Sequence, residues 1–222
     1  MQDFSVRLPF ANRAEAGRLL GRRLQADHLQ GPLVVVALPR GGVPVAAQVA
    51  RCRGSPLDLL IVRKIGAPWQ RELAVAAVVD GTPPEVVIDE EISAATGADA
   101  AYIEREAAVE RREIERRRAT YLHGRAPLAL AGTTVILVDD GIATGTTVRA
   151  ALKALRRRGA TKVVLAVPVA PGDTVMALRG SCDHVVCLAE PQPFRAVGDH
   201  YLDFHQVDDM EVMAAFGAEQ QE

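Results

Sequence analysis

Short apolar runs alternate with segments of helical periodicity along most of the chain. The apolar runs lie at residues 33–38, 57–62, 133–138, 162–167 and 184–188. Each is rich in aliphatic, mostly β-branched residues and too short for a typical helix, a pattern typical of strands buried on both faces of a sheet. The alternation of strands and helices therefore predicts an α/β fold with a mostly parallel twisted sheet flanked by helices.

The segments between these runs carry helix and turn signals. Asn12 is followed three residues later by Glu15 and then by apolar residues at helical spacing, which predicts a capped amphipathic helix over 12–25. Further helices are predicted at 43–51, 146–158 and 173–179, the second closed by Gly159. Glycine and proline interrupt residues 65–88, where we expect a loop and hairpin.

The segment 89–123 is predicted to be helical and highly charged. Residues 103–118 hold eleven charges in sixteen positions. Because acids and bases alternate there, the pattern favours a solvated helix with i,i+4 ion pairs, although its basic end, 111–118, leaves nucleic-acid binding open. Its thin apolar stripe is a candidate surface for a homodimer. We expect one domain, with a core at about 31–190, this charged helical insert at about 90–123 and a small hood from the C-terminal tail, 191–222.

Overall charge and cysteine content narrow the choice of environment. The chain has 26 basic and 28 acidic residues, a net charge of −2, which gives no basis for binding nucleic acid or an anionic membrane. Its three cysteines, Cys52, Cys182 and Cys187, suit a reducing compartment, and the latter two are expected to be small core residues. The first residues lack a long apolar segment, and no run of about 18 apolar residues occurs. We therefore expect a cytoplasmic protein.

The richest candidate for chemistry is VILVDDGIATGTT at 135–147. A buried strand delivers Asp139 and Asp140 to the sheet edge where open α/β sheets bind ligands. The following helix N-terminus and the hydroxyls of its threonines suit a phosphate dianion. Because the carboxylates repel phosphate, they should face a metal or neutral donors such as two ribose hydroxyls. The implied ligand is a ribose with a 5′-phosphate; the simpler alternative is an acidic turn before a helix cap.

Two better-known phosphate motifs are excluded by their spacing. A P-loop requires a lysine after its last glycine, but Thr146 follows Gly145. The G-x-G-x-x-G dinucleotide fingerprint is also absent.

The stretch 135–147 resembles the phosphoribosyl pyrophosphate motif of the type I phosphoribosyltransferases, a hydrophobic strand, two acidic residues and T-G-x-T. By element order the resemblance extends over about 33–188. It implies that the two acids hold the ribose hydroxyls and that the following loop wraps the 5′-phosphate. The implied ribose-5-phosphate site is Asp139, Asp140, Gly141, Ala143, Thr144, Gly145, Thr146 and Thr147. Gly141 departs from the family, in which an aliphatic residue is more usual.

A second candidate element is the turn Pro39-Arg40-Gly41-Gly42 after the first strand. Alone, it is a tight connection. Similar family members bind pyrophosphate on this loop, often with a strained peptide before the first glycine, so the resemblance implies a pyrophosphate site formed by Arg40, Gly41, Gly42 and Lys64. Glycine amides can approach an anion closely, and a guanidinium suits bidentate phosphate contact.

The third candidate element is Arg63-Lys64, at the expected end of the second strand. Only three of the 26 basic residues are lysines, so a lysine here suggests a need for a compact ammonium, although two cations at a strand end can simply be solvated. In some similar family members an Arg-Lys pair leads into a flexible loop. Residues 66–72 are therefore a candidate lid, with Arg71 for phosphates and Glu72 for orienting a partner.

The resemblance implies a Mg²⁺-dependent phosphoribosyltransferase that moves the phosphoribosyl group from phosphoribosyl pyrophosphate to a nucleobase-like small molecule, as in nucleotide salvage. Mg²⁺ would be held mainly by the substrate, near Asp139 and Asp140, and the catalytic candidates are Lys64, Arg63, Asp139 and Asp140. Family members that act on 6-oxopurines have an acid where Ala143 stands, but adenine and orotate enzymes also lack it. The alternatives are a non-catalytic sensor of phosphoribosyl pyrophosphate and a sugar-phosphate hydrolase.

Aromatic residues are concentrated in the C-terminal tail. Phe194, Tyr201 and Phe204 are candidates for stacking on a planar acceptor, and the alternative is that they fasten the tail to the sheet edge. A metal site from His200, Asp203 and His205 is disfavoured, because a spacing of five does not put both histidines on one helical face.

Overall fold

A five-stranded parallel sheet forms the centre of the chain, of which the computed structural model describes residues 6–81, 83–122 and 125–218. The strand order is β2-β1-β6-β7-β8. The strands are β1 (Leu33–Ala37), β2 (Leu57–Leu59), β6 (Thr134–Val138), β7 (Lys162–Val169) and β8 (His184–Ala189). All four neighbouring pairs are parallel, which confirms the predicted fold class.

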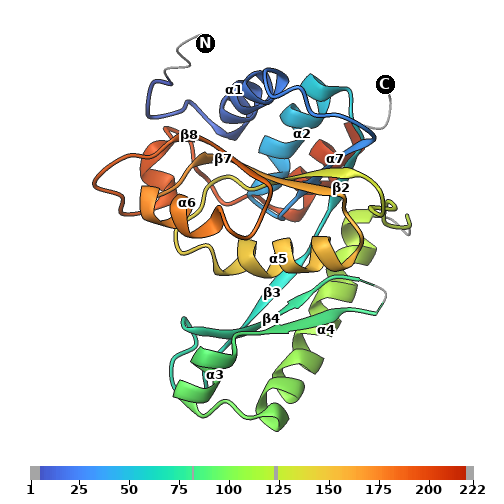
Figure 1. Ribbon diagram of the computed structural model, residues 1–222, viewed down its shortest axis with the longest axis vertical. Helices are drawn as coiled ribbons and strands as arrows, with labels where there is room; N and C mark the ends of the chain where they lie inside the picture. The colour runs from blue at the N-terminus through green and yellow to red at the C-terminus, as the bar shows by residue number, and fades with distance from the viewer. Residues whose placement is uncertain (1–5, 82, 123–124, 219–222) are drawn as a thin grey trace.

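Helices cover both faces of this sheet, as Figure 1 shows. On one side lie α1 (Arg13–Gln25) and α2 (Gly42–Arg53), and on the other α5 (Thr146–Arg157) and α6 (Gly172–Leu178). Successive residues of β1 belong to opposite cores: Val35 packs with α2, whereas Val34 and Val36 pack with α5. This alternation explains why the strand is apolar at every position.

A second, antiparallel sheet lies beside α5. It contains β3 (Val62–Gly66), β4 (Ala74–Val79) and β5 (Glu85–Ile88) in the order β3-β4-β5. The hairpin expected within 65–88 is thus present, but the single strand expected over 57–62 is wrong. The chain leaves the parallel sheet after Leu59 and enters the second sheet at Val62. Residues 57–61 are buried and Val62 is half-buried, so the continuous apolar run gave no sign of the change of sheet.

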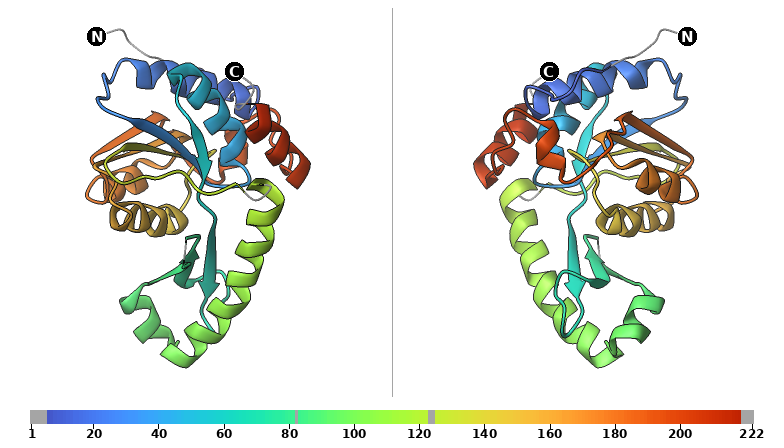
Figure 2. Two further views of the ribbon diagram at one scale, coloured as in Figure 1. Left: turned by 90° about the vertical axis from the view of Figure 1, so that its right-hand side faces the viewer. Right: turned by 90° about the vertical axis from the view of Figure 1, so that its left-hand side faces the viewer.

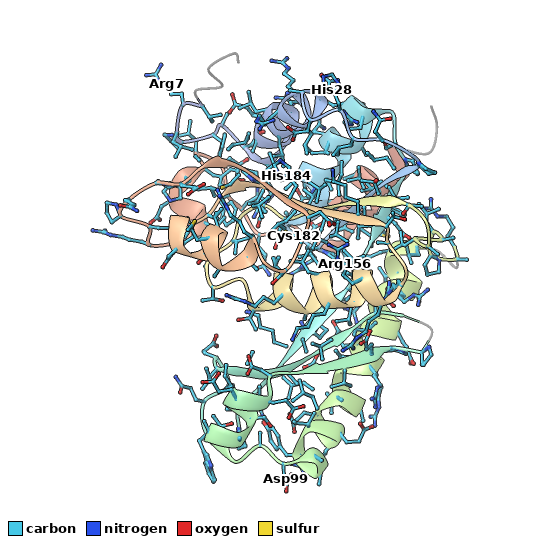
Figure 3. The ribbon with its side chains drawn as sticks, viewed as in Figure 1. Arg7, His28, Asp99, Arg156, Cys182 and His184 are labelled. Atoms are coloured by element: carbon cyan, nitrogen blue, oxygen red, sulfur yellow. The ribbon has the colours of Figure 1, made fainter. Side chains whose placement is uncertain are left out.

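The charged segment folds as two helices, α3 (Glu90–Thr96) and α4 (Ala100–Leu122), which leaves His123 outside the described residues. Gly97 ends α3 with a left-handed φ of 68°. Asp99 begins α4 by accepting a hydrogen bond from the Tyr102 amide at 2.7 Å. In Figure 3, Asp99 lies at the end of the molecule farthest from the parallel sheet. The predicted ion pairs are present: Glu113 binds Arg116 and Arg117, and these contacts lower its pKa to about 2.

The long helix α4 joins the two sheets. It packs on β3 and β4 and reaches α7 (Asp209–Ala218) at its C-terminal end, as both views in Figure 2 show. All six residues of β4 are buried, because α4 covers one face of the strand and α5 the other. The small sheet therefore shares its core with the parallel sheet. None of the described helices is long and apolar enough to cross a membrane.

The tail runs back along the N-terminal segment before it forms α7. The 3₁₀ turn η1 spans Val197–His200, and the Phe10 amide then donates to the His200 carbonyl at 2.8 Å. Phe10 and Tyr201 are buried together, with ring centroids 5.4 Å apart. The tail beyond residue 218, the end of the expected hood, lies outside the described residues.

Close packing of α1 on α2 depends on glycine. A Cβ at Gly17 would stand 2.5 Å from the Val45 carbonyl oxygen, which is shorter than real Cβ contacts. The position of α1 matters because this helix begins with a residue of the candidate site described below.

We expect Gly17→Ala to lower the free energy of unfolding by about 1–3 kcal/mol, because the added methyl group forces the two helices apart. The sign of this change is informative, since Gly→Ala within a helix otherwise raises the free energy of unfolding by about 1 kcal/mol through helix propensity. Urea denaturation measures the effect, and Arg18→Ala, at an exposed position of the same helix, is the control. A stabilised Gly17→Ala variant would contradict the close approach.

Candidate functional site

The candidate site forms where β1 and β6, neighbours in the sheet, end at the same edge. The turn that follows β1 touches the two aspartates that follow β6. A Cβ on Gly41 would stand 2.1 Å from Oδ2 of Asp140, and one on Gly42 would stand 3.0 Å from the Cα of Asp139. Both positions therefore favour glycine, because a side chain at either one would collide with the segment that carries Asp139 and Asp140. The Pro39–Arg40 peptide in this turn is cis.

A cavity of about 220 Å³ lies over the start of α5. It is lined by Asp139, by residues 141–148, by Lys64 of β3 and by Val197 of the tail. Gly145 precedes the helix with a φ of 76°, and no side chain caps it. The amides of the first helical turn thus remain for an anion, since they have no partner within the helix. We call this cavity the phosphate-loop pocket.

Two side chains hold the outer side of the loop. Oγ1 of Thr174, on α6, donates to the Ala143 carbonyl at 2.9 Å, and a guanidinium nitrogen of Arg149 donates to the Thr144 carbonyl at 3.1 Å. Each contact satisfies a loop carbonyl, so the loop is braced before any ligand arrives. The residue types in the sequence gave no sign of either contact.

Gly141, where the resemblance implies an aliphatic residue, has a steric explanation. A Cβ there would stand 2.5 Å from a methyl group of Val197 and 3.0 Å from one of Val169. An aliphatic side chain would therefore push the tail away from the pocket. Glycine lets Val197 form part of the pocket wall.

The two carboxylates line different cavities. Asp139 faces the phosphate-loop pocket, whereas Asp140 lines a neighbouring cavity with Arg13, Arg40 and Gly41, which we call the arginine pocket. Burial raises the pKa of Asp139 well above its usual range, and the adjacent Asp140 raises it further. Burial also raises the pKa of Asp140, but the Arg13 guanidinium opposes that rise. The sequence predicted that both acids belong to the site, but not that they line different cavities.

Arg13 is a site residue that the sequence did not reveal. Its Nε donates to Oδ2 of Asp140 at 2.8 Å, and another guanidinium nitrogen donates to the His205 carbonyl at 2.9 Å. The side chain is only 9% exposed. A signal did exist: Arg13 lies on the stripe of α1 that also carries Ala16, Leu20 and Leu24, all buried. A charged residue at an apolar position of an amphipathic helix suggests a buried partner.

Arg40 lines the arginine pocket, and its guanidinium also has a carboxylate partner on α7. Its guanidinium is 3.6 Å from Oδ1 of Asp209, at the start of α7. The same carboxylate accepts a hydrogen bond from the Tyr121 hydroxyl at 2.6 Å and lies 3.8 Å from the guanidinium of Arg116. Asp209 was also missed, since nothing local links it to a turn some 170 residues away in the chain.

The expected Arg63-Lys64 pair divides between two faces of one strand. Both residues lie within β3, where successive side chains point to opposite sides. Lys64 lines the phosphate-loop pocket, whereas Nε of Arg63 donates to Glu110 of α4 at 2.7 Å. The structure thus brings Lys64 to the site and gives Arg63 a partner outside it.

Residues 66–72, the candidate lid, form the end of the β3–β4 hairpin. The Ala67 amide donates to the Leu73 carbonyl at 2.8 Å, and a Cβ on Gly66 would overlap the Arg71 backbone. The Gly66 carbonyl accepts a hydrogen bond from the Tyr102 hydroxyl at 2.8 Å. At the tip, Trp69 is 93% exposed. Arg71 and Glu72 are also at the surface, and their predicted roles remain predictions.

The tail aromatics pack against one another and against the N-terminal segment, and Phe204 also lines the arginine pocket. Tyr201 is buried beside Phe10, and its hydroxyl donates to the Asp140 carbonyl at 2.5 Å. Phe204 stacks with Tyr201 at 5.0 Å, and the Arg13 guanidinium lies 3.8 Å from the centre of its ring. Phe194 packs against the same cluster. This favours the fastening alternative, with Tyr201 as a support for Asp140.

The sequence pattern disfavours a metal site in the tail and a reactive role for Cys182 and Cys187. His205 is held between Asp203 and Glu211 at 2.8 and 2.7 Å, and the described residues contain no cluster of three or more metal-ligating side chains. The three cysteines are free. Burial raises the pKa of Cys187 to about 12, which disfavours the thiolate form that acts as a nucleophile.

Comparison with known proteins identifies a family and a close structural match. The model of the phosphoribosyl transferase domain matches residues 12–204. A Mycobacterium tuberculosis H37Rv protein, provisionally named phosphoribosyl transferase Rv0571c, is 47% identical over 209 residues, which cover 92% of this chain and 46% of that protein. Its counterpart MT0597 from strain CDC 1551 is equally similar. The chain thus spans about half the length of these curated relatives. The crystal structure of TT1426 from Thermus thermophilus is 44% identical and superposes with a TM-score of 0.82, covering 94% of this chain and 98% of that one.

We expect Arg13→Gln to raise the apparent pKa of the Asp139–Asp140 pair, because the cation that opposes protonation of Asp140 is lost. The folded-state pKa then lies further above that of the unfolded chain. The variant should therefore lose more stability at neutral pH than at acid pH.

Carboxyl ¹³C NMR titration measures the pKa, and thermal unfolding at two pH values measures the stability. Arg18→Gln removes an exposed cation from the same helix and serves as the control. An unchanged or lowered pKa in Arg13→Gln would show that the Arg13–Asp140 contact does not set the charge state of the pair.

Proposed function

Because the chain belongs to the phosphoribosyl transferase domain family, we propose that it transfers the phosphoribosyl group of phosphoribosyl pyrophosphate to a small, nucleobase-like acceptor and releases pyrophosphate. One observation carries the proposal. Asp139, Lys64 and the loop that begins α5 line one pocket, and the glycine turn after β1 adjoins it. A carboxylate, an ammonium and a ring of amides are the groups that a phosphorylated ribose with a pyrophosphate leaving group requires.

In this proposal each part of the substrate meets a complementary group. The 5′-phosphate binds the amides and hydroxyls of residues 144–147, at the positive end of α5. The ribose hydroxyls donate to Asp139 and to the Asp140 oxygen that Arg13 does not hold. The pyrophosphate lies toward Arg40, Lys64 and the amides of the glycine turn. This distribution keeps the carboxylates away from the phosphates, which they would repel.

The residues present fit a Mg²⁺ ion that is held mainly by the substrate. The chain offers two carboxylates at the sheet edge, and the described residues contain no cluster of three or more ligands that could hold the ion alone. Mg²⁺ prefers oxygen ligands and commonly binds through one or two carboxylates together with substrate phosphates. When bound, it would neutralise charge on the pyrophosphate. Asp139 and Asp140 are the residues that would lie near it.

The chemistry is a substitution at C1 of the ribose. The acceptor's lone pair forms the new bond to C1, the electrons of the C1–O bond leave with pyrophosphate, and the acceptor's N–H proton is released to water or to the pyrophosphate. Positive charge builds on the ring beside Asp139 and Asp140, and negative charge builds on the leaving group beside Lys64 and Arg40. These residues stabilise the transition state electrostatically, so no side chain needs to attack the substrate.

The pairing of Arg40 with Asp209 adds a step to binding. For its guanidinium to face pyrophosphate, Arg40 must exchange a carboxylate partner for phosphate oxygens. Asp209 keeps Tyr121 and Arg116 as partners after that exchange, so its charge is not left unpaired. The exchange therefore costs less than the loss of an isolated ion pair.

The proposal predicts saturable, Mg²⁺-dependent binding of phosphoribosyl pyrophosphate by isothermal titration calorimetry. A screen of nucleobases for pyrophosphate release then identifies the acceptor. Absence of binding at millimolar ligand would remove the proposal. Binding without release in any mixture would instead favour a sensor, and phosphate release without an acceptor would favour a hydrolase.

With the acceptor identified, Lys64→Ala should lower kcat by roughly 100-fold and change KM much less, because the ammonium acts on charge that develops in the transition state. Arg63→Ala is the matched control, since it removes the neighbouring cation on the face that binds Glu110, and its kcat should stay close to that of the wild type. Equal losses in the two variants would refute the assignment of Lys64.

The double variant Asp139→Asn, Asp140→Asn should abolish substrate binding and leave the circular dichroism unchanged.

A further inference from the structure

We propose that a groove beside the phosphate-loop pocket is a second ligand site, which binds a small planar heterocycle that carries an anionic group. The groove has a volume of about 270 Å³ and lies between α5, the strands β4 and β5 and the start of α3, elements that are neighbours in Figure 1. It is distinct from the phosphate-loop pocket, but Thr146 lines both.

The floor of the groove is apolar and built from small side chains. It is lined by Ala74, Ala76, Ala77, Val87 and Ile88. Alanine side chains are short, so the floor is recessed where larger residues of a strand would fill it. Ligand sites are commonly apolar cavities with a few polar groups, and this one is at the small end of their size range. A single flat ring system suits both its surface and its volume.

One wall of the groove is cationic. Arg149 and Lys153 are four residues apart on α5, so they lie on the same face of the helix, and both line the groove. Lys153 is exposed and has no hydrogen-bond or ion-pair partner within the described part of the chain. It is also one of only three lysines in the protein. An unpaired ammonium beside a guanidinium at an apolar cavity is suited to an anionic substituent.

Among the described residues that line the groove, Asp89 is the only other charged one. Oδ1 of Asp89 caps α3 by accepting a hydrogen bond from the Ile92 amide at 3.1 Å, which leaves the second oxygen for a donor. This carboxylate repels an anion and accepts from N–H groups. A ligand therefore orients with its anionic group toward α5 and its ring N–H groups toward Asp89.

The groove does not suit the acceptor of the transfer, an argument that rests on the proposed function. There, the start of α5 holds the 5′-phosphate, and C1 lies across the ribose ring from the 5′ carbon. A molecule in the groove reaches α5 from the phosphate end of the substrate. It cannot attack C1, so its role is that of an effector.

Arg149 connects the groove to the phosphate loop. It lines the groove and also donates to the Thr144 carbonyl of that loop. A ligand anion that engages this guanidinium changes how firmly the loop is held. By linkage, an effector in the groove and a ligand on the loop alter each other's affinity by the same factor.

Orotate is a suitable probe, because it is a planar ring with N–H donors and one carboxylate. Calorimetric titration without phosphoribosyl pyrophosphate should show one saturable site. Lys153→Glu should weaken binding by about tenfold or more, since attraction becomes repulsion. Lys162→Glu makes the same charge change on β7, outside the groove, and should bind like the wild type.

Three results would overturn the groove site: no saturable binding at millimolar orotate, equal affinity in Lys153→Glu, or loss of binding in Asp139→Asn, Asp140→Asn, which would place the probe in the substrate site. Circular dichroism confirms folding, and Lys153 is exposed, so its replacement disturbs no core. These titrations contain no phosphoribosyl pyrophosphate, so they stand even if the proposed transfer fails. Repeating them with it measures the coupling through Arg149.

Discussion

The tightest constraint at the site is the contact between the turn after β1 and the carboxylates after β6. Two neighbouring parallel strands end together, and only hydrogen at Gly41 and Gly42 leaves room for the aspartate segment. This contact fixes where Asp140 lies, and therefore where Arg13 and Tyr201 must meet it. The first helix and the tail thus each contribute one side chain to the same aspartate.

Burial of two adjacent acids is unfavourable, and the structure offsets that cost with groups from distant segments. Asp140 takes a guanidinium from the first helix and a hydroxyl on its carbonyl from the tail. Asp139 keeps a raised pKa because burial and the charge of the adjacent Asp140 outweigh the contacts that lower it. A carboxylate with unsatisfied acceptors at a pocket wall is ready to take donors from a ligand. The two carboxylates therefore oppose folding when they are buried, but they favour binding of a ligand that donates hydrogen bonds to them.

The elements that sequence predicted best are those defined by local signals. The strand, acidic pair and glycine-threonine loop at 135–147 are contiguous, so their spacing could be interpreted directly. Arg13 and Asp209 act on residues far away in sequence, and only Arg13 left a trace, as a charge on an apolar stripe. Tyr201 was a candidate from the sequence, but its contact with Asp140 was not predicted. The change of sheet after Leu59 was invisible because both sheets bury aliphatic side chains. The opposite directions of the Arg63 and Lys64 side chains follow from their positions within β3, a strand that the sequence did not predict.

The support of Asp140 by Arg13 and by Tyr201 has a consequence for biosynthesis. These two residues are separated by most of the domain, and a nascent chain emerges from the ribosome from its N-terminus onward. The strands, the turn and the phosphate loop can all form while Tyr201 is still inside the exit tunnel. The acidic centre is completed only after the tail has emerged. Before then Asp140 lacks its Tyr201 partner, so the nascent chain is expected to bind its ligand weakly.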